Sequence, residues 1–473
     1  MVKLIKLKKG YDLKLMGGLA SDEVAPAAES SLFAVIPDDF TGVTPRMEVK
    51  EGERVAAGDV LFHDKSHEEI KVTSPVAGVV KAINRGERRK IESIVIERDD
   101  SSSRKSFDLK FVKAKDTVRP FFDPDGFPAT LHKVSCYDSD KVKDILLSSG
   151  LWSMIRQRPY DIVPNPDATV RDIFVTCFDS APLAPSLMVA LGEKSKYIEK
   201  GVAILNCLTK GKVYLGCRAS ETIEVDGAET VIFKGPHPAG NAGVQAANIA
   251  PVNKGDCVLT LDVVTLARIG YLFTEGTMDF SATVAVVGSE VKEPKYVPCT
   301  IGCQISSLVS GNLKSDTECE RIISGNVLTG TQVTLNSYLR LPYRQVSVIP
   351  ELVNKDEFMG WASLSPKKFS VYHDFTHWLF GGDKKENVMD ARINGGERAI
   401  VMSGEYDRML PMDIYGEFLI KAIIAFDIDK MEQLGIYEVA PEDFALAEYA
   451  DTSKLELQRI VREGLDRMRK EME

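Results

Sequence analysis

Residues 49–61 read Val49-Lys50-Glu51-Gly52-Glu53-Arg54-Val55-Ala56-Ala57-Gly58-Asp59-Val60-Leu61, a run of strand-forming residues interrupted twice by glycine. After a short polar stretch follows a second run, Val72-Thr73-Ser74-Pro75-Val76-Ala77-Gly78-Val79-Val80. Valine is enriched in strands, and glycine permits the positive φ that many tight turns require. The two runs therefore predict a compact module of short strands and tight turns over residues 32–98.

This pattern resembles the biotinyl/lipoyl barrel-sandwich fold, in which a similar pair of strands ends in P-V-x-G-x-V. Carrier proteins of that fold present a modified lysine on the hairpin between the two halves. The corresponding hairpin here is residues 62–70, where Lys65 lacks the Met-Lys-Met or Asp-Lys-Ala context of the carriers. We therefore expect an unmodified barrel-sandwich that serves as a scaffold, and not a carboxylase or acyltransferase carrier.

Length, composition and charge limit the classes of function that the chain can have. The chain has 473 residues, of which 44% are hydrophobic and 27% are charged, and these values indicate several globular domains. The net charge of −10 argues against a nucleic-acid-binding protein. The longest candidate span, residues 418–426, is interrupted by Lys421 and is shorter than a bilayer requires. With no signal peptide at the start, a cytoplasmic location is expected.

Metal-binding patterns are weak. The eight cysteines are scattered, and the only cluster, Cys299, Cys303 and Cys319, fits no standard zinc or iron–sulfur spacing. His373 and His377 are four residues apart, but the glutamate of a H-E-x-x-H site is replaced by Asp374. No metal site and no catalytic residue is predicted.

Strands alternate with helices after the first module. Helices are expected at residues 141–152, at residues 244–249 and in a segment that begins at residue 185. Strands are expected at residues 172–177, 213–217 and 230–233, and residues 202–205 could form either a helix or a strand. This alternation predicts a mostly parallel, Rossmann-like sheet. The dinucleotide fingerprint and the P-loop are absent. The loop at residues 234–243 follows a strand and precedes a helix, where α/β folds bind ligands.

The remaining chain has a different character. Residues 283–296 form a hairpin pattern typical of β-grasp domains of the soluble-ligand-binding (SLBB) type, and 414–424, 441–447 and 454–472 read as helices. The fold class is thus multi-domain, α/β and α+β. The predicted segments are an N-terminal strand with a barrel-sandwich hybrid domain (1–103), a Rossmann-like α/β domain (104–254), a β-grasp domain opening with a strand at 256–262 (255–335), a connecting segment with a strand at 343–350 (336–380) and a C-terminal helical domain (381–473).

The C-terminal domain contains the spacing of a bacterial ferredoxin site, C-x2-C-x2-C-x3-C-P, but none of its cysteines. Counted back from Pro411, the ligand positions are Ile400, Ser403, Tyr406 and Leu410. About forty residues later, the same spacing falls on Ala440, Asp443, Leu446 and Ala450. One carboxylate does not hold a cluster, so spacing alone favours an ordinary helical tail.

Taken together, the chain resembles the NqrA subunits of the bacterial Na+-translocating NADH:quinone reductases (Nqr). The most specific pieces are Ser149-Gly150-Leu151-Trp152, Arg156-Gln157-Arg158-Pro159, Gly235-Pro236-His237-Pro238-Ala239-Gly240, Phe358-Met359-Gly360-Trp361 and Arg408-Met409-Leu410-Pro411-Met412-Asp413-Ile414. The sister family is the RnfC protein of the Rnf complex, which has two four-iron clusters at its C-terminus. The resemblance implies a member that keeps this frame and has lost the clusters.

The resemblance also implies a role. Such a protein is peripheral, on the cytoplasmic face of the inner membrane, and binds no iron–sulfur cluster and no flavin of its own. Its partners are the other Nqr subunits, chiefly the membrane subunit with covalent flavin, and through them the membrane. The complex reduces ubiquinone to ubiquinol and exports Na+. We expect the chain to contribute to ubiquinone binding; the alternative is a non-catalytic docking role.

Candidate ligand contacts follow from the two most family-specific loops of the α/β domain. Their polar residues and backbone could contact a quinone or a partner, and the alternative is that the arginines satisfy backbone carbonyls or acids. The candidates are Arg156, Arg158, His237, Gly240 and Asn241.

Overall fold

The computed structural model describes residues 3–99, 101–109, 115–122, 128–314, 320–352, 369–372, 376, 379 and 385–472. The sequence features at 358–361, at His373 and His377, and at Cys319 lie outside the described residues.

The N-terminal module is a barrel-sandwich of two small antiparallel sheets, as predicted. One sheet has the order β2-β8-β7-β4 and the other β3-β5-β6. Leu61, Phe62, Val80 and Ile94 are buried in its core. Its strands are β2 (Leu32–Val35), β3 (Pro45–Met47), β4 (Arg54–Val55), β5 (Val60–Asp64), β6 (Lys71–Thr73), β7 (Gly78–Arg85) and β8 (Ile91–Arg98), with short 3-10 turns η1 (Pro37–Asp39) and η2 (Glu87–Arg89).

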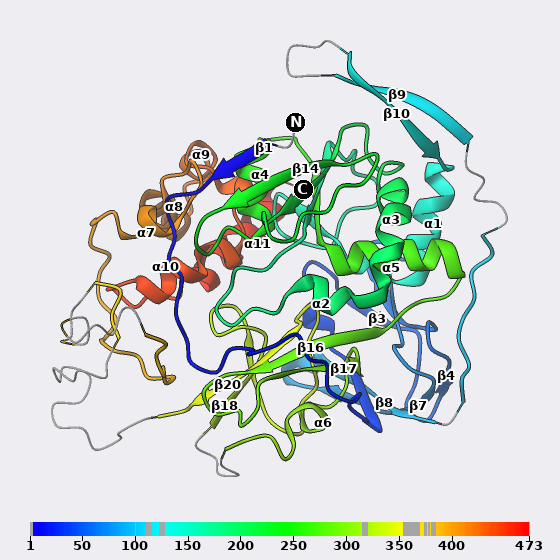
Figure 1. Cartoon of the computed structure of the whole chain (residues 1–473), viewed down its shortest axis with the longest axis horizontal. Helices are drawn as coiled ribbons and strands as arrows, with labels where there is room; N and C mark the ends of the chain where they lie inside the picture. Colours follow the sequence, from blue (N-terminus) through cyan, green and yellow to red (C-terminus); the bar gives the residue numbers. More distant parts are fainter. Residues whose placement is uncertain are drawn as a thin grey trace.

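A six-stranded sheet forms the centre of the molecule (Figure 1). Its order is β1-β14-β13-β12-β15-β11, and only β11 runs antiparallel to its neighbour. The sequence correctly predicted a mostly parallel sheet. The strands are β1 (Lys3–Lys6), β11 (Arg156–Arg158), β12 (Asp172–Thr176), β13 (Val213–Cys217), β14 (Glu229–Lys234) and β15 (Val258–Asp262).

Both faces of this sheet are covered, because successive side chains of a strand point to opposite faces. In β12, Ile173 and Val175 join the large core beneath the helices α1, α3 and α5, whereas Phe174 packs with Ala246 of α4 on the other face. The helices are α1 (Ser139–Ser149), α2 (Leu187–Leu191), α3 (Ile198–Leu205), α4 (Ala242–Ile249) and α5 (Val263–Glu275), with 3-10 turns η3 (Trp152–Met154) and η4 (Gly192–Tyr197). A separate hairpin, β9 (Lys115–Phe122) and β10 (Pro128–Cys136), leads into α1.

The β-grasp segment has the strand order β17-β16-β20-β18-β19. Its central pair, β16 and β20, is parallel, and the other pairs are antiparallel. The elements are β16 (Ser281–Val287), β17 (Lys295–Thr300), α6 (Ile305–Val309), β18 (Glu320–Ser324), β19 (Thr331–Val333) and β20 (Gln345–Pro350).

Helices form the C-terminal segment and pack on the α4 side of the sheet (Figure 1). The positions of the ferredoxin spacing contribute to this packing: Tyr406, Leu410, Leu446 and Ala450 all belong to the buried core. The elements are α7 (Glu405–Met409), α8 (Gly416–Ala425), α9 (Ile428–Gln433), η8 (Ile436–Glu438), η9 (Pro441–Phe444), α10 (Ala445–Ala450) and α11 (Leu457–Met472).

Three strands lie in a different sheet from the segment in which the sequence placed them. β1 pairs with β14 of the α/β sheet, and not with the barrel-sandwich that follows it in the chain. β15 pairs with β12 of the same sheet, although its sequence was read as the opening of the β-grasp segment. β20 completes the β-grasp sheet and is not part of a connection. Strand pairing over long sequence separations has no local signal, so proximity in the chain misassigned all three.

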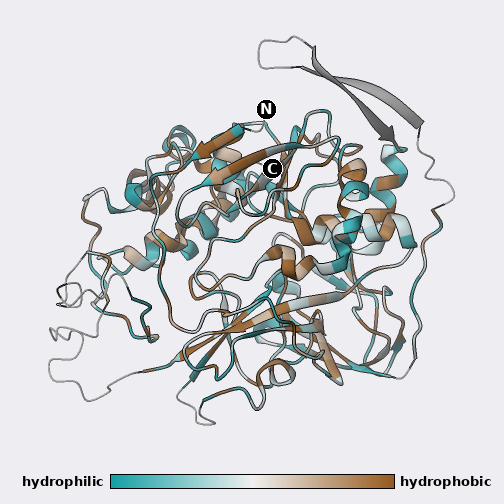
Figure 2. Cartoon of the chain, in the orientation of Figure 1, coloured by the Kyte–Doolittle hydropathy of each residue, from teal (hydrophilic) through white to brown (hydrophobic). Residues whose placement is uncertain are grey.

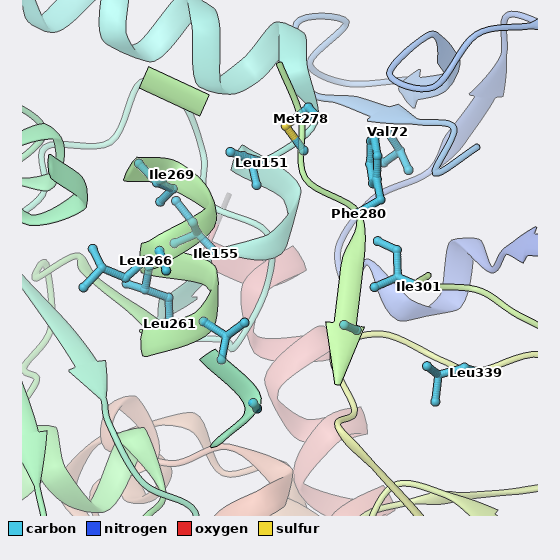
Figure 3. Packing of buried hydrophobic residues seen from close by; sticks show 14 of the residues in the cluster. Val72, Leu151, Ile155, Leu261, Leu266, Ile269, Met278, Phe280, Ile301 and Leu339 are labelled. Carbon is cyan, nitrogen blue, oxygen red and sulfur yellow. The ribbon is translucent and has the colours of Figure 1, made fainter. Parts of the chain in front are cut away.

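The segments share one core. Figure 3 shows Val72 of the barrel-sandwich, Leu151 and Ile155 of the α/β segment, and Phe280 and Ile301 of the β-grasp segment gathered in one region. Hydrophobic residues occur in the elements of all these segments (Figure 2), and buried ones from each segment belong to one cluster. Because burying such side chains is the main favourable contribution to folding, these segments stabilise one another.

Candidate functional site

A cavity of about 460 Å³ opens at the carboxyl ends of β12 and β15. The chain passes from β12 outward to β13 and β14, and then returns to place β15 on the other side of β12. The gap between β12 and β15 is therefore the point where the strand order reverses, which is where open α/β sheets bind ligands. The volume falls within the range of small-molecule sites.

Every major segment contributes to the wall. Phe40 comes from the barrel-sandwich, Phe178 from the end of β12, Tyr343 from the β-grasp segment, and Glu442 and Arg462 from the C-terminal helices. A site built at the junction of four segments is closed by their packing, so its shape depends on the whole assembly.

His237 lies in the wall of this cavity with 4% of its surface exposed. Its backbone N–H donates to Asp12 Oδ1 at 2.8 Å, and its ring Nδ1 lies 3.0 Å from Ser180 Oγ. The other ring nitrogen, Nε2, has no hydrogen-bond partner among the described residues. Burial lowers the pKa of His237 to about 4, so the ring is neutral at neutral pH.

The tautomer of His237 depends on its neighbours. Ser180 Oγ accepts the backbone N–H of Gly240 at 2.8 Å. With the Ser180 hydroxyl proton donated to His237 Nδ1, one of the two tautomers these contacts allow, the ring proton lies on Nε2. A buried N–H donor without a partner among the described residues is thereby presented at the cavity wall. Such groups carry a desolvation cost of roughly 1–3 kcal/mol that an acceptor on a ligand would remove.

Gly240 makes this arrangement possible. A Cβ at this position would lie 2.6 Å from the backbone nitrogen of Ser180 and 2.9 Å from its Oγ. Asn241 follows as the N-terminal flanking residue of α4; its side chain does not cap the helix but donates to the carbonyl of Glu442 at 3.3 Å. Both residues line the cavity, as the sequence analysis expected of a ligand loop.

Arginines form much of the remaining polar surface. Arg156 donates through Nη2 to the carbonyl of Asp39 at 2.5 Å, and its Nη1 has no partner among the described residues. Arg268, fully buried on α5, donates through Nη2 to the carbonyl of Ser281 at 2.8 Å and leaves Nε without a partner in the same part of the chain. Burial, with Arg344 nearby, lowers the pKa of Arg268 to about 10, so it stays protonated at neutral pH.

Arg344 differs from Arg156 and Arg268, because its positive charge is paired with a carboxylate. Its Nε and Nη2 both donate to Asp262 Oδ2, at 2.8 and 2.5 Å. Burial opposes ionisation of Asp262, but Arg344 and the Thr265 donors outweigh it and hold its pKa below the usual value. The Asp262 side chain also caps α5 by accepting the Thr265 N–H at 2.6 Å, which fixes the end of β15 at the cavity.

Arg158 does not line the cavity. Its guanidinium is 1% exposed and donates to Asp443 Oδ2 at 2.7 Å, to Glu442 Oε1 at 2.9 Å and to the carbonyl of Glu438 at 3.0 Å. The residue therefore ties β11 to the C-terminal helices. Of the five sequence candidates, four meet at the cavity and Arg158 braces the structure beside it.

Three acids in the wall, Asp39, Asp179 and Glu442, have raised pKa values. Burial raises the pKa of Asp39 to about 6, against the opposing charge of Arg340. The Glu442 side chain is 45% exposed, and its partial burial with Asp443 nearby raises its pKa above the usual value, partly offset by Arg158. Perturbed acids gathered in a cavity are typical of functional sites.

Sequence reasoning missed several wall residues. Asp262, Arg268 and Arg344 of the wall, together with Ser180, which contacts His237, belong to no motif, and the folded chain alone brings them together. A local signal did exist for Asp262, an acid between a buried strand and an apolar helix, which is typical of an N-cap. Among the described residues, no group of three or more histidine, cysteine or acidic side chains is placed to hold a metal ion.

Comparison with known proteins gives three matching domain families, in order along the chain. The NqrA N-terminal barrel-sandwich hybrid domain matches residues 5–99, the NqrA second alpha/beta domain matches 137–278, and the NQRA C-terminal domain, of SLBB type, matches 283–334. The fold class expected from the sequence is confirmed by these matches together with the C-terminal helices of the structure.

Full-length relatives show the same family. The chain is 36% identical to the NqrA protein of the Na(+)-translocating NADH-quinone reductase of Saccharophagus degradans, over 99% of this chain and 100% of that protein. The corresponding proteins of Hahella chejuensis and Vibrio anguillarum are 35% and 33% identical, with the same coverage. A solved NAD+-reducing NiFe-hydrogenase superposes with a TM-score of 0.35 at 13% identity, covering 69% of this chain and 60% of that chain, which is too low to carry a structural argument.

The three domains in this order define a multidomain component of a Na+-translocating reductase. The chain belongs to the NqrA family of the Na+-translocating NADH-quinone reductases, and the resemblance drawn from its sequence is confirmed. It is one component of an enzyme complex, whose other subunits are its partners. Within the described part of the chain, none of the helices has the length and apolar character needed to cross a bilayer.

Proposed function

We propose that this chain holds the ring of ubiquinone in the cavity between β12 and β15, and so contributes to ubiquinone reduction by the complex. The observation that carries this proposal is the buried Nε2 of His237, which has no partner among the described residues and lies in a cavity at the reversal point of the sheet. The two carbonyls of a quinone ring accept hydrogen bonds and donate none, so they complement such a donor.

The cavity suits a ring of this kind. Phe40, Phe178, Leu261 and Tyr343 supply apolar or aromatic wall, and His237 with Arg156 supplies N–H donors. Small-molecule sites typically combine a mostly apolar lining with a few placed polar groups that fix orientation.

In this proposal the chain carries no iron–sulfur cluster and no flavin. Electrons reach the quinone from other subunits, chiefly the membrane subunit with covalent flavin, to which the chain docks on the cytoplasmic face of the inner membrane. Support comes from the C-terminal helices, where Leu410, Leu446 and Ala450 pack in the core at positions that would carry cluster ligands. The reduction of ubiquinone is coupled to Na+ export by the complex as a whole.

The test is a titration of the purified chain with a soluble short-chain ubiquinone analogue, followed by calorimetry. We expect saturable binding that weakens about tenfold in His237→Gln, since a hydrogen bond to a buried donor is lost. His67→Gln is the matched control, because His67 lies on the barrel-sandwich hairpin away from the cavity. Equal affinity in His237→Gln and wild type would remove His237 from the site, and absence of binding in the wild type would refute the proposal.

A second candidate function is docking without quinone chemistry. It is favoured by exposed apolar side chains on and beside α8, where Tyr415, Phe418 and Ile424 are 63%, 57% and 55% exposed. Phe418→Ser should then abolish co-purification with the membrane flavoprotein without changing the folded stability. Quinone binding by the isolated chain would show that docking is not its sole function.

A further inference from the structure

The unsatisfied polar atoms of the cavity are mainly donors. Arg156 Nη1, Arg268 Nε and His237 Nε2 have no hydrogen-bond partner among the described residues, and Gln345 Oε1 is the corresponding acceptor in the same wall. His237 and Arg268 are at most 4% exposed, so bulk water does not satisfy them. A ligand that satisfies this wall is rich in acceptors.

Two of these donors, Arg156 and Arg268, carry a positive charge and form no ion pair within the described residues. In the described part of the chain, no carboxylate lies within 4.0 Å of the guanidinium of Arg156 or Arg268. The other two arginines of the wall do have acidic partners: Arg344 pairs with Asp262, and Arg462 pairs with Asp466 at 2.7 Å. Uncompensated buried charge is costly, and an anion placed between two guanidinium groups relieves that cost.

The wall also contains acids, and each of them is engaged by another group. Asp39 is engaged by Arg340, Asp161 lies 3.9 Å from Arg462, and Glu442 accepts from Arg158 at 2.9 Å. The remaining acid of the wall, Asp179, accepts the N–H of Ala181 at 2.8 Å and faces the charge of Arg218. Each acid therefore has its own local cation or donor, and none of them lies within ion-pair distance of Arg156 or Arg268, although the charge of Arg156 does act on Asp39.

Helix α4 adds to the positive potential. It begins at Ala242 on the cavity wall, and Asn241, which could have capped it, donates instead to the carbonyl of Glu442. The N-terminus of an α-helix carries a partial positive charge and free N–H groups. The helix end, the two arginines and His237 thus present donors to one space.

We propose that this cavity binds the quinone ring in its anionic form, as semiquinone anion or deprotonated quinol, more tightly than as neutral quinone; this rests on the proposed function. A site that favours the reduced anion over the oxidised ring makes the bound quinone easier to reduce, because a ligand shifts an equilibrium by its difference in affinity for the two states. Arg156 and Arg268 act here as positioning residues for the ring oxygens.

The experiment compares two oxidised naphthoquinone probes that differ by one charge, titrated in the absence of reductant. These are 1,4-naphthoquinone, which is neutral, and 2-hydroxy-1,4-naphthoquinone, whose hydroxyl is ionised at neutral pH. Calorimetric titration of the full chain should give at least about tenfold tighter binding of the ionised probe. Arg156→Gln should remove most of this preference and Arg156→Lys should retain part of it, while the exposed control Arg54→Gln leaves it unchanged.

The outcomes separate the two proposals. Tighter binding of the ionised probe that depends on the charge at Arg156 supports the inference. Equal affinity for both probes overturns the inference and leaves quinone binding intact. Binding of neither probe overturns both. Arg156 is partly exposed and is not part of the Arg158 ion-pair cluster, and a thermal melt of each variant checks that it is folded.

Discussion

The guanidinium of Arg158 donates to Asp443 Oδ2 at 2.7 Å, although the two residues are 285 positions apart in the chain. Both are at most 1% exposed. Asp443 is the one carboxylate at the positions of the ferredoxin spacing, and here it anchors the C-terminal helices to the edge strand β11. This ion pair therefore joins two parts of the fold that lie far apart in the sequence.

Breaking this joint should destabilise the fold. Arg158→Ala leaves Asp443 buried without its cation, and we expect a loss of about 3–5 kcal/mol in the free energy of unfolding. Denaturant titration followed by far-ultraviolet circular dichroism measures it. The matched control is Arg46→Ala, whose ion pair with Glu68 is exposed and should contribute less than about 1 kcal/mol. Similar losses in both variants would contradict the structural role of Arg158.

The shared core predicts cooperative unfolding. Leu151 is fully buried and packs in the region where the barrel-sandwich, α/β and β-grasp segments meet (Figure 3). Leu151→Ala should cost about 2–5 kcal/mol and shift the transitions of all three segments together. Hydrogen exchange with mass spectrometry distinguishes the segments. Selective loss of protection in the α/β segment alone would contradict a common core.

Gly240→Ala should weaken both the fold and ligand binding. The added Cβ would displace Ser180, which is the hydrogen-bond partner of His237. We expect a destabilisation of about 1–3 kcal/mol and a weaker response to the ubiquinone analogue. Gly396→Ala is the control, since nothing lies within 4 Å of a Cβ at that position. A Gly240 variant with unchanged stability would show that the loop relaxes without cost.

The lowered pKa of His237 predicts that the free energy of unfolding depends on pH. Its pKa is lowered from 6.5 to about 4 in the folded chain, so between these values the unfolded chain binds more protons. The stability that this residue contributes is present above pH 6.5 and is lost as the pH falls to about 4, by about 3 kcal/mol in total. Denaturation of wild type and His237→Gln at several pH values measures the difference. Parallel pH profiles would contradict the burial of a neutral imidazole.

Much of the fold could be predicted from local sequence. The glycine-punctuated runs at 49–61 and 72–80 indicated the barrel-sandwich, because turn chemistry and strand propensity are local properties. Alternation of helix and strand indicated the parallel sheet for the same reason. The sheet membership of β1, β15 and β20 was wrong because pairing partners lie far away in the chain or across a segment boundary.

The candidate site likewise contains residues that the sequence could indicate and residues that only the fold brings together. The loop containing His237, Gly240 and Asn241 could be found because a polar, glycine-rich turn between strand and helix is visible in sequence. Arg268 could not be found in this way. It lies within an apolar helix, and the sequence of such a helix does not show whether a buried arginine lines a cavity. Arg158 was chosen for its neighbours in the chain, and the fold turned it toward the C-terminal helices.

The pairing of β1 with β14 has a consequence for synthesis of the chain. Lys3–Lys6 emerges from the ribosome some 230 residues before its parallel partner, Val231–Lys234. At about 5–20 residues per second, the first strand waits on the order of ten to fifty seconds for its place in the sheet. The barrel-sandwich, which follows β1 in the chain, can assemble in the meantime, so β1 is fixed in its sheet later than the strands that come directly after it.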